Sequence, residues 1–371
     1  MKTLALVKKD FHSQGGLEKV TTKILEALLE RAAQVSLYTS STSSHLCPTF
    51  TYKPKGFLKV QKLKDFDRWI KQQTAHHDVI FSMDRCSFQT HHRAGNGVHA
   101  AYLDLRSEFE GPLRKLSFAL NPLHRFQLEL ERKTFESDST KIIIVNSEMV
   151  KNQILKYYKT PPSKIHVVHN GVEWNELEAD FNDSLTNRTK YLADLGLDPS
   201  VYQFLFVGHN FKRKGLDVLL EALSLLHNKN FHLSVVGHDK HIAAYQMLAK
   251  RLGLASQVTF FGSDPSTKPY YLAADCLVIP SIYDPFANVT VEALALGLFA
   301  VSSKMNGGHE VLRSQSGITV QNCQSAEELA TALEIALNHP KTPERAKEIR
   351  STIAHLDYPI QLKKICDLCL G

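Results

Sequence analysis

The sequence has no long apolar run and few cysteines. No stretch reaches the ~18 apolar residues that a membrane-spanning helix needs, so we expect no such helix. The N-terminal run Leu4–Val7 is too short for a signal-peptide core and favours a buried first strand in a cytoplasmic protein. Only Cys366 and Cys369 have C-x-x-C spacing, and without a second pair they favour free thiols over a zinc site.

Common nucleotide and metal motifs are also missing. The G-x-G-x-x-G fingerprint and the G-x-x-x-x-G-K-[ST] P-loop are absent, which disfavours a dinucleotide site and ATP hydrolysis. No RRM, KH or helix-turn-helix signature occurs, so we expect no nucleic acid partner. His91, His92 and His99 are a poor ligand set, because adjacent histidines rarely face one ion. We expect no metal site, of the D-x-D type or any other, and no cofactor.

The charge is unevenly distributed along the chain. Residues 1–170 carry 26 Lys and Arg against 16 Asp and Glu, whereas residues 171–371 carry 18 against 22. The basic half indicates an anionic partner such as an acidic lipid surface or acceptor, or else a solvated basic face. Residues 110–133 interleave basic and apolar side chains, a pattern typical of a helix on an anionic membrane and also of a core helix with one solvated face.

Short apolar strands alternate with helical patterns, which predicts parallel α/β sheets. In the first half we expect strands at Thr3–Val7, Val35–Tyr38, Val79–Phe81, Ile142–Val145 and Ile165–Val168. The second half repeats the alternation, with strands at Phe204–Val207, Leu233–Val236, Val258–Phe261, Cys276–Ile279 and Phe299–Ser302. A polar, acidic stretch from Asn170 to about Asn187 is the expected linker. The pattern therefore predicts two successive doubly wound units.

Ligands of open parallel sheets bind beyond the carboxyl ends of the strands, and three loops there carry unusual residues. Gly15 and Gly16 open a helix, where they allow close approach of a ligand or simply satisfy the turn. The segment Lys212-Arg213-Lys214 lies between glycines. Three adjacent cations favour a bound diphosphate, or else form an exposed basic loop.

The third loop, Pro280–Asn288, precedes a helix that contains Glu292. The carboxylates of Asp284 and Glu292 can accept hydrogen bonds from sugar and ribose hydroxyls, and the amides near Ala287–Val289 can donate to a phosphate. The alternative is a charge at a helix N-terminus and one surface glutamate.

The order of these motifs resembles that of the family 4 glycosyltransferases of the GT-B fold. The resemblance runs from Gly15 to about Gly317 and includes Arg213-Lys214-Gly215, Asp284-x7-Glu292 and Gly297. The segment Val168–Val172 looks like the interdomain junction of that family. The segment Ala94–Leu103 looks like the branch that contains the lipopolysaccharide-core glucosyltransferases.

The resemblance implies two Rossmann-like domains facing across a cleft. Residues 1–170 would form an acceptor domain, with a C-terminal helix at about 356–371 packing back on it, and residues 171–355 a donor domain. Arg213 and Lys214 would bind the donor diphosphate, Glu292 the ribose, and His99 would lie beside the transferred sugar. Asp284 would hold that sugar with the residues that follow it, and the two adjacent glycines would let donor and acceptor meet. The implied donor-binding set is Gly15, Gly16, Phe286, Ala287, Asn288, Val289 and Glu292.

The implied activity is retaining, metal-independent transfer of a hexose from a nucleoside-diphosphate sugar, UDP-linked, to a glycan or lipid-linked glycan such as lipopolysaccharide core. The protein would act in the cytoplasm or peripherally on the inner face of the membrane. Asp284 and Ala287 stand where the family usually has Glu and Gly, and both bear on donor choice. The alternative functions are that of a nucleotide-sugar epimerase of the same fold and that of a non-catalytic sugar-nucleotide or membrane-docking module.

Overall fold

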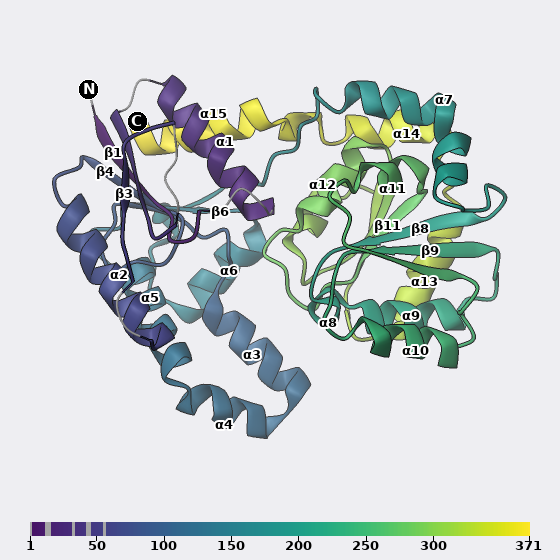
Figure 1. The fold of residues 1–371 in the computed structure, drawn as a ribbon, viewed down its shortest axis with the longest axis horizontal. Coiled ribbons are helices and arrows are strands. Elements are labelled where there is room, and N and C mark those ends of the chain that lie inside the picture. The colour runs from purple at the N-terminus through teal and green to yellow at the C-terminus, as the bar shows by residue number, and fades with distance from the viewer. Residues whose placement is uncertain (1, 12–15, 32–33, 42–45, 55–56) are drawn as a thin grey trace. The chain divides into compact units, whose positions relative to one another are not determined.

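The computed structural model describes residues 2–11, 16–31, 34–41, 46–54 and 57–371, and the chain divides into two compact units (Figure 1). The first unit comprises residues 1–170 with 359–371, and the second comprises residues 171–358. Each is built on a parallel sheet flanked by helices, which confirms the predicted α/β class with two Rossmann-like halves.

In the described part of the first unit, seven parallel strands lie in the order β3-β2-β1-β4-β5-β6-β7. Their bounds are β1 Thr3–Val7, β2 Gln34–Thr39, β3 Thr49–Thr51, β4 Val79–Ser82, β5 His91–Arg93, β6 Ile142–Val145 and β7 Ile165–Val167. The helices are α1 Gly16–Glu30, α2 Lys59–Thr74, α3 His99–Glu110, α4 Pro112–Leu120, α5 Pro122–Glu136, α6 Glu148–Tyr157 and α15 Tyr358–Leu370. Strand order reverses between β1 and β4, which makes that boundary the topological switch point of the sheet.

The second sheet has the order β10-β9-β8-β11-β12-β13. Its strands are β8 Tyr202–Val207, β9 Phe231–Val236, β10 Val258–Gly262, β11 Cys276–Ile279, β12 Phe299–Ser303 and β13 Gly317–Val320. The helices are α7 Glu178–Asp194, α8 Phe211–Lys214, α9 Leu216–Leu225, α10 Ile242–Arg251, α11 Lys268–Ala273, α12 Asn288–Ala295, α13 Ala326–Leu337 and α14 Pro343–Ser351. The switch point lies between β8 and β11, which are buried along their whole length, as expected of central parallel strands.

The expected linker from Asn170 to about Asn187 is wrong, because most of it is helix α7 of the second unit. Phe181 and Leu192 of α7 are buried, and Arg188 forms an ion pair with the buried Asp275 at 2.6 Å. The many acidic residues of this stretch suggested a linker, but its apolar residues lie on one face of a helix.

Residues 359–371 belong to the first unit although they end the chain. Within that unit, Asp367 of α15 forms an ion pair with Arg31, which directly follows α1, at 2.7 Å. The chain thus leaves the first unit after Asn170 and returns to it after Tyr358.

Candidate functional site

The loop between β8 and α9 brings two cations to the switch point of the second sheet. Asn210 adopts a left-handed conformation, and its side chain caps α8 by accepting a hydrogen bond from the Arg213 amide at 3.2 Å. Gly215 has a φ of 80°, and a Cβ there would lie 2.2 Å from the Pro280 carbonyl oxygen, so only glycine fits. This close approach holds α8 against the loop that follows β11.

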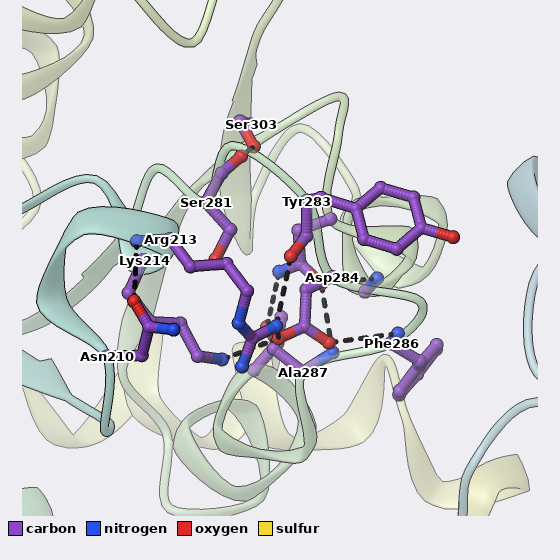
Figure 2. A network of polar contacts seen from close by, with 12 residues as sticks. Asn210, Arg213, Lys214, Ser281, Tyr283, Asp284, Phe286, Ala287 and Ser303 are labelled. Carbon is purple, nitrogen blue, oxygen red and sulfur yellow. Dashed lines mark hydrogen bonds and ion pairs between the residues drawn. The ribbon is translucent and has the colours of Figure 1, made fainter. Parts of the chain in front are cut away.

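Asp284, in the loop after β11, pairs with both cations (Figure 2). Its Oδ2 accepts hydrogen bonds from Lys214 Nζ at 2.7 Å and from Arg213 Nη1 at 3.1 Å. Arg213 Nη1 also donates to the Tyr283 carbonyl oxygen at 3.0 Å, and Asp284 Oδ1 accepts from the Phe286 amide at 3.2 Å. The structure therefore brings together three of the predicted catalytic residues, Arg213, Lys214 and Asp284.

The charges of this cluster do not cancel. Burial by itself raises the pKa of the Asp284 carboxyl, but the charges of Lys214 and Arg213 outweigh it and hold the pKa below its ordinary value. One ionised carboxylate thus faces two cations and leaves one positive charge. The expectation of three cations acting together is wrong for Lys212, because its ammonium pairs with Asp217 and its side chain is 70% exposed.

A buried asparagine that sequence reasoning missed shapes the loop after Asp284. Asn306 Oδ1 accepts hydrogen bonds from the amides of Ala287 at 2.9 Å and Gly308 at 3.0 Å. Its Nδ2 donates to Ser302 Oγ at 2.9 Å and Thr290 Oγ1 at 3.2 Å, so the fully buried amide is satisfied on both sides. Nothing in the local sequence marks Asn306, because its partners include Thr290 of α12, Ser302 of β12 and the loop amide of Ala287.

These bonds change which backbone amides the loop can offer. The amides of Phe286 and Ala287, both in the predicted donor-binding set, already donate to Asp284 and Asn306. Helix α12 begins at the next residue, Asn288, and continues with Val289, so its N-terminus directly follows this loop.

Glu292 lies further along α12, where it accepts a hydrogen bond from the Tyr271 hydroxyl at 2.9 Å. Burial, reinforced by the neighbouring carboxylate, raises the pKa of Tyr271 well above its usual range. The Tyr271 hydroxyl therefore stays protonated and orients Glu292. No motif marks Tyr271, which is a core residue of α11.

In the first unit, His99 begins α3 beside a buried carboxylate. Glu131 is fully buried and accepts hydrogen bonds from the amides of His99 at 2.7 Å and Ala100 at 3.1 Å. It also accepts from Arg85 Nε at 2.6 Å and from the Tyr158 hydroxyl at 2.5 Å. Four donors thus satisfy Glu131, which fixes the position of His99.

The His99 ring is neutral at physiological pH. Burial, with the nearby Arg85 charge, lowers its pKa to about 4. Its Nε2 lies 3.1 Å from Nδ1 of His124 in a hydrogen bond between the two rings. His99 is therefore suited to hydrogen bonding and not to carrying charge.

The structure describes one of the two predicted glycines. Gly15 lies outside the described residues. Gly16 is the first residue of α1, the place predicted for a helix N-terminus after the first strand.

Among the described residues, no group of three or more His, Cys, Asp or Glu side chains could hold a metal ion. The sequence does contain a D-x-D triplet, contrary to expectation, at Asp65-Phe66-Asp67. It lies within α2, where Asp65 pairs with Arg68 at 3.3 Å and Asp67 accepts hydrogen bonds from Ser87 N and Oγ at 2.6 and 2.7 Å. These carboxylates therefore have structural partners.

The basic-apolar stretch at residues 110–133 forms α4 and α5. On α4, Leu113, Leu116 and Leu120 are 84%, 59% and 70% exposed, and their spacing places them on one face of the helix. Arg114 and Lys115 are exposed on the same short helix. No helix in the described part of the chain is both long and apolar enough to cross a membrane.

Comparisons with known families cover both units. Residues 14–175 match Glycosyltransferase Family 4, and residues 187–351 match Glycosyl transferases group 1. The second match contains Arg213, Lys214, Asp284 and Glu292, and the first contains His99.

Curated relatives of the chain are also named as glycosyltransferases. The lipopolysaccharide glucosyltransferase WaaG of Escherichia coli K12 is 25% identical over 353 residues, which cover 87% of this chain and 86% of that protein. An uncharacterized glycosyltransferase of Methanocaldococcus jannaschii is 31% identical over 182 residues, which cover 48% of this chain and 46% of that protein. The chain thus matches less than half the length of the archaeal relative.

Two solved structures share the fold along nearly the whole chain. The crystal structure of WaaG, a glycosyltransferase involved in lipopolysaccharide biosynthesis, has a TM-score of 0.81 at 22% identity and covers 99% of this chain and 100% of that one. HepE of Anabaena, in complex with UDP and glucose, has a TM-score of 0.70 at 16% identity and covers 99% of each.

Proposed function

The chain belongs to the glycosyltransferases of the GT-B fold, and on that premise we propose that it is a retaining, metal-independent enzyme that moves a hexose from a UDP-linked donor to a glycan or glycolipid acceptor. The observation that carries the proposal is the pair of cations that share one carboxylate at the switch point of the second sheet. A diphosphate is the anion that this net positive cluster fits best. The name of WaaG, lipopolysaccharide glucosyltransferase, supports a hexose donor and a lipopolysaccharide acceptor.

Catalysis would rest on stabilising the departing nucleotide. As the bond between the anomeric carbon and the phosphate oxygen breaks, negative charge grows on the diphosphate, and Arg213 and Lys214 would stabilise it. An acceptor hydroxyl would attack from the face that the diphosphate leaves, and its proton would pass to a donor phosphate oxygen. The anomeric configuration is then kept. Glu292 would bind the ribose, Asp284 would contact the hexose, and neutral His99 would donate or accept a hydrogen bond at the sugar.

The side chains of Arg213 and Lys214, and not a metal ion, would neutralise the charge of the nucleotide. The experiment is to measure transfer from UDP-hexoses in excess chelator and to determine the anomeric configuration of the product by NMR. We expect full activity and a retained configuration. Loss of activity that magnesium or manganese restores would refute metal independence, and an inverted product would refute the mechanism.

The same assay separates the rival activities. With donor alone, an epimerase would interconvert UDP-hexoses, whereas a transferase would release UDP only slowly by hydrolysis. We expect the second result, and rapid interconversion without acceptor would overturn the assignment of a transfer reaction.

The acceptor would be presented at a membrane. We propose that the first unit docks peripherally on anionic lipid at the cytoplasmic face, supported by the excess of cations in residues 1–170 and by the exposed leucines of α4. A lipid-linked glycan would then reach the enzyme by diffusion in two dimensions.

A further inference from the structure

The outer edge of strand β7 lies in an open groove of the first unit, with a volume of about 540 Å³. Strand β7 ends the strand order of its sheet, so one side of it pairs with β6 and no strand in the described part of the chain covers the other side. Helices α6 and α15, which lie on opposite sides of the sheet, form the two walls of the groove (Figure 1). The predicted site uses none of the residues that line this groove.

The backbone of Val167 faces the open edge of β7. Val168 N donates to the Val145 carbonyl oxygen of β6 at 2.8 Å, and successive residues of a strand point their backbone groups to opposite sides. Val167 therefore directs its amide and its carbonyl oxygen away from β6 and into the groove. An edge strand that presents its main-chain groups in this way is a template for pairing with a strand of another chain.

The groove has an apolar floor and a charged rim, which is the composition of a protein–protein interface. Ile165 and Val167 of β7 and Leu368 of α15 form the floor, where Ile165 is buried and the other two are half-buried. The rim has four charged side chains, which are Glu148, Lys151, Lys364 and Asp367. Two acids and two bases leave the rim without net charge, so it does not favour a strongly acidic or strongly basic partner.

The order of these charges makes the rim complementary to a second copy of itself. Each wall carries one acid and one base three residues apart, Glu148 and Lys151 on α6 and Lys364 and Asp367 on α15. A two-fold axis perpendicular to the sheet near Val167 sets the two β7 strands antiparallel, and it sets each helix antiparallel to its own copy. On both walls, the acid of one copy then faces the base of the other.

The contact between Glu148 and Lys151 within one copy is weak enough to be exchanged. Their side chains are 3.6 Å apart, and they are 55% and 29% exposed. Exposed ion pairs of this kind contribute about 0–1 kcal/mol, so replacing this contact by one between two copies costs little.

We propose that two copies of the chain associate through this groove, with the β7 strands paired antiparallel and with the α6 and α15 rims paired acid to base. The two copies of Val167 then exchange a pair of main-chain hydrogen bonds across the axis. Because the groove is small and its rim is polar, the association is reversible and depends on concentration. It does not depend on the proposed transfer reaction.

Sedimentation velocity of the full-length protein, from about 1 to about 200 µM, measures the association in the range expected of a small interface. We expect one reversible step from a single chain to two. Val167→Pro removes the outward amide and spares the bonds to β6, and proline is tolerated at such an edge position. It should abolish the dimer, and circular dichroism should show that the fold is kept.

Charge reversal tests whether the occupant is a second copy. Glu148→Lys and Lys151→Glu each place like charges across the axis, so each should weaken the dimer about ten-fold. An equimolar mixture of these two variants should associate at least as tightly as the parent, because a rim with two bases then meets a rim with two acids. Lys133→Glu, which breaks the exposed pair with Glu129 on α5, is the matched control and should dimerise as the parent does.

Three results would overturn the proposal. The first is a monomer at every concentration. The second is a dimer that both reversals leave intact, because association would then use another face. The third is failure of the mixture to restore association, or an equal loss in Lys133→Glu, because the charges would then not pair across the groove. The reversals and their mixture decide the question even if Val167→Pro does not fold.

Discussion

Lys214 Nζ lies 2.7 Å from Asp284 Oδ2, the oxygen that also accepts a hydrogen bond from Arg213. The side chains of Lys214 and Asp284 are 9% and 10% exposed, so the pair is formed largely out of water. Asp284 therefore compensates the cations before a donor arrives. An incoming diphosphate must share or displace this carboxylate, which makes Asp284 a competitor of the leaving group as well as a candidate sugar contact.

Removing either cation should slow transfer without unfolding the protein. Lys214→Ala or Arg213→Ala should lower kcat/KM by about 100- to 1,000-fold, the usual cost of losing one preorganised group that stabilises transition-state charge. Arg213 is the cleaner test because its side chain is 32% exposed and leaves Lys214 to balance Asp284. Steady-state kinetics and circular dichroism would measure activity and folding.

Lys212→Ala is the matched control. It removes an adjacent positive charge that is exposed and paired with Asp217, away from Asp284. We expect kcat/KM within two-fold of the parent, since surface ion pairs contribute about 0–1 kcal/mol. If the three variants lose activity equally, net charge and not the specific pairing governs catalysis.

Asp284→Asn should separate nucleotide binding from transfer. The substitution keeps the size of the side chain but removes the charge that competes with the diphosphate. We expect UDP to bind about ten-fold more tightly, equal to about 1.4 kcal/mol, and kcat to fall because the sugar contact is weakened. Calorimetric titration with UDP measures the first effect, and an unchanged or weaker UDP affinity would contradict the competition.

The stability of the first unit should depend on pH through its buried histidines. Burial lowers the pKa of His91 to about 4, of His92 to about 3 and of His99 to about 4, from an ordinary 6.5. Between pH 6.5 and 4 the unfolded chain binds protons that the folded unit excludes. The free energy of unfolding is therefore highest above pH 6.5 and falls as the pH drops, by up to about 1.4 kcal/mol per pH unit for each histidine.

His92→Gln should reduce this dependence. Trp69 belongs to the first unit and Trp174 to the second, so fluorescence in a Trp174→Phe background follows the first unit alone. The loss of stability between pH 7 and 5 in urea titrations should be smaller with His92→Gln than without it. His227→Gln, at an exposed position in the second unit, should change nothing, and an equal pH dependence in all three proteins would contradict the assignment.

Apolar patterning predicted the central strands well. The predicted bounds of Thr3–Val7 and Cys276–Ile279 match β1 and β11, because continuous apolar runs flanked by polar residues identify strands buried on both faces. Strand β5 was missed because its sequence is His91-His92-Arg93. The residues of β5 are buried, and their polar side chains find hydrogen-bond partners far away in the sequence. Arg93 Nη2, for example, donates to Asn170 Oδ1 at 2.6 Å.

The part of the candidate site that is made of consecutive residues could be predicted from the sequence. The part that depends on residues far apart in the sequence could not. The Lys212-Arg213-Lys214 run marked the loop, but only the structure shows that Lys212 turns to Asp217 while the other two turn to Asp284. Asn306 and Tyr271 support the site from other loops and helices, and a single sequence carries no period or motif for such contacts.

Membrane docking should have separable apolar and electrostatic parts. Leu113, Leu116 and Leu120 present an apolar face on α4, and burying it in the lipid interface does not depend on salt. Arg114, Lys115 and Arg125 add an attraction of about 1 kcal/mol each near an anionic surface, which salt screens. Arg114 should contribute least because it already pairs with Glu110 at 2.9 Å.

Flotation with vesicles of increasing anionic lipid content, at low and high salt, would measure both parts. Changing the three cations to Glu should remove the salt-sensitive binding, and changing the three leucines to Ser should weaken binding at every salt concentration. The matched control reverses the exposed Lys240, Lys250 and Arg251 of the second unit, which should leave binding intact because these charges lie outside the basic half of the chain. UDP affinity should stay constant in all variants, since the donor cluster lies in the second unit. A parent protein that stays free of anionic vesicles even at low salt would overturn docking, and the exposed leucines would then need another partner.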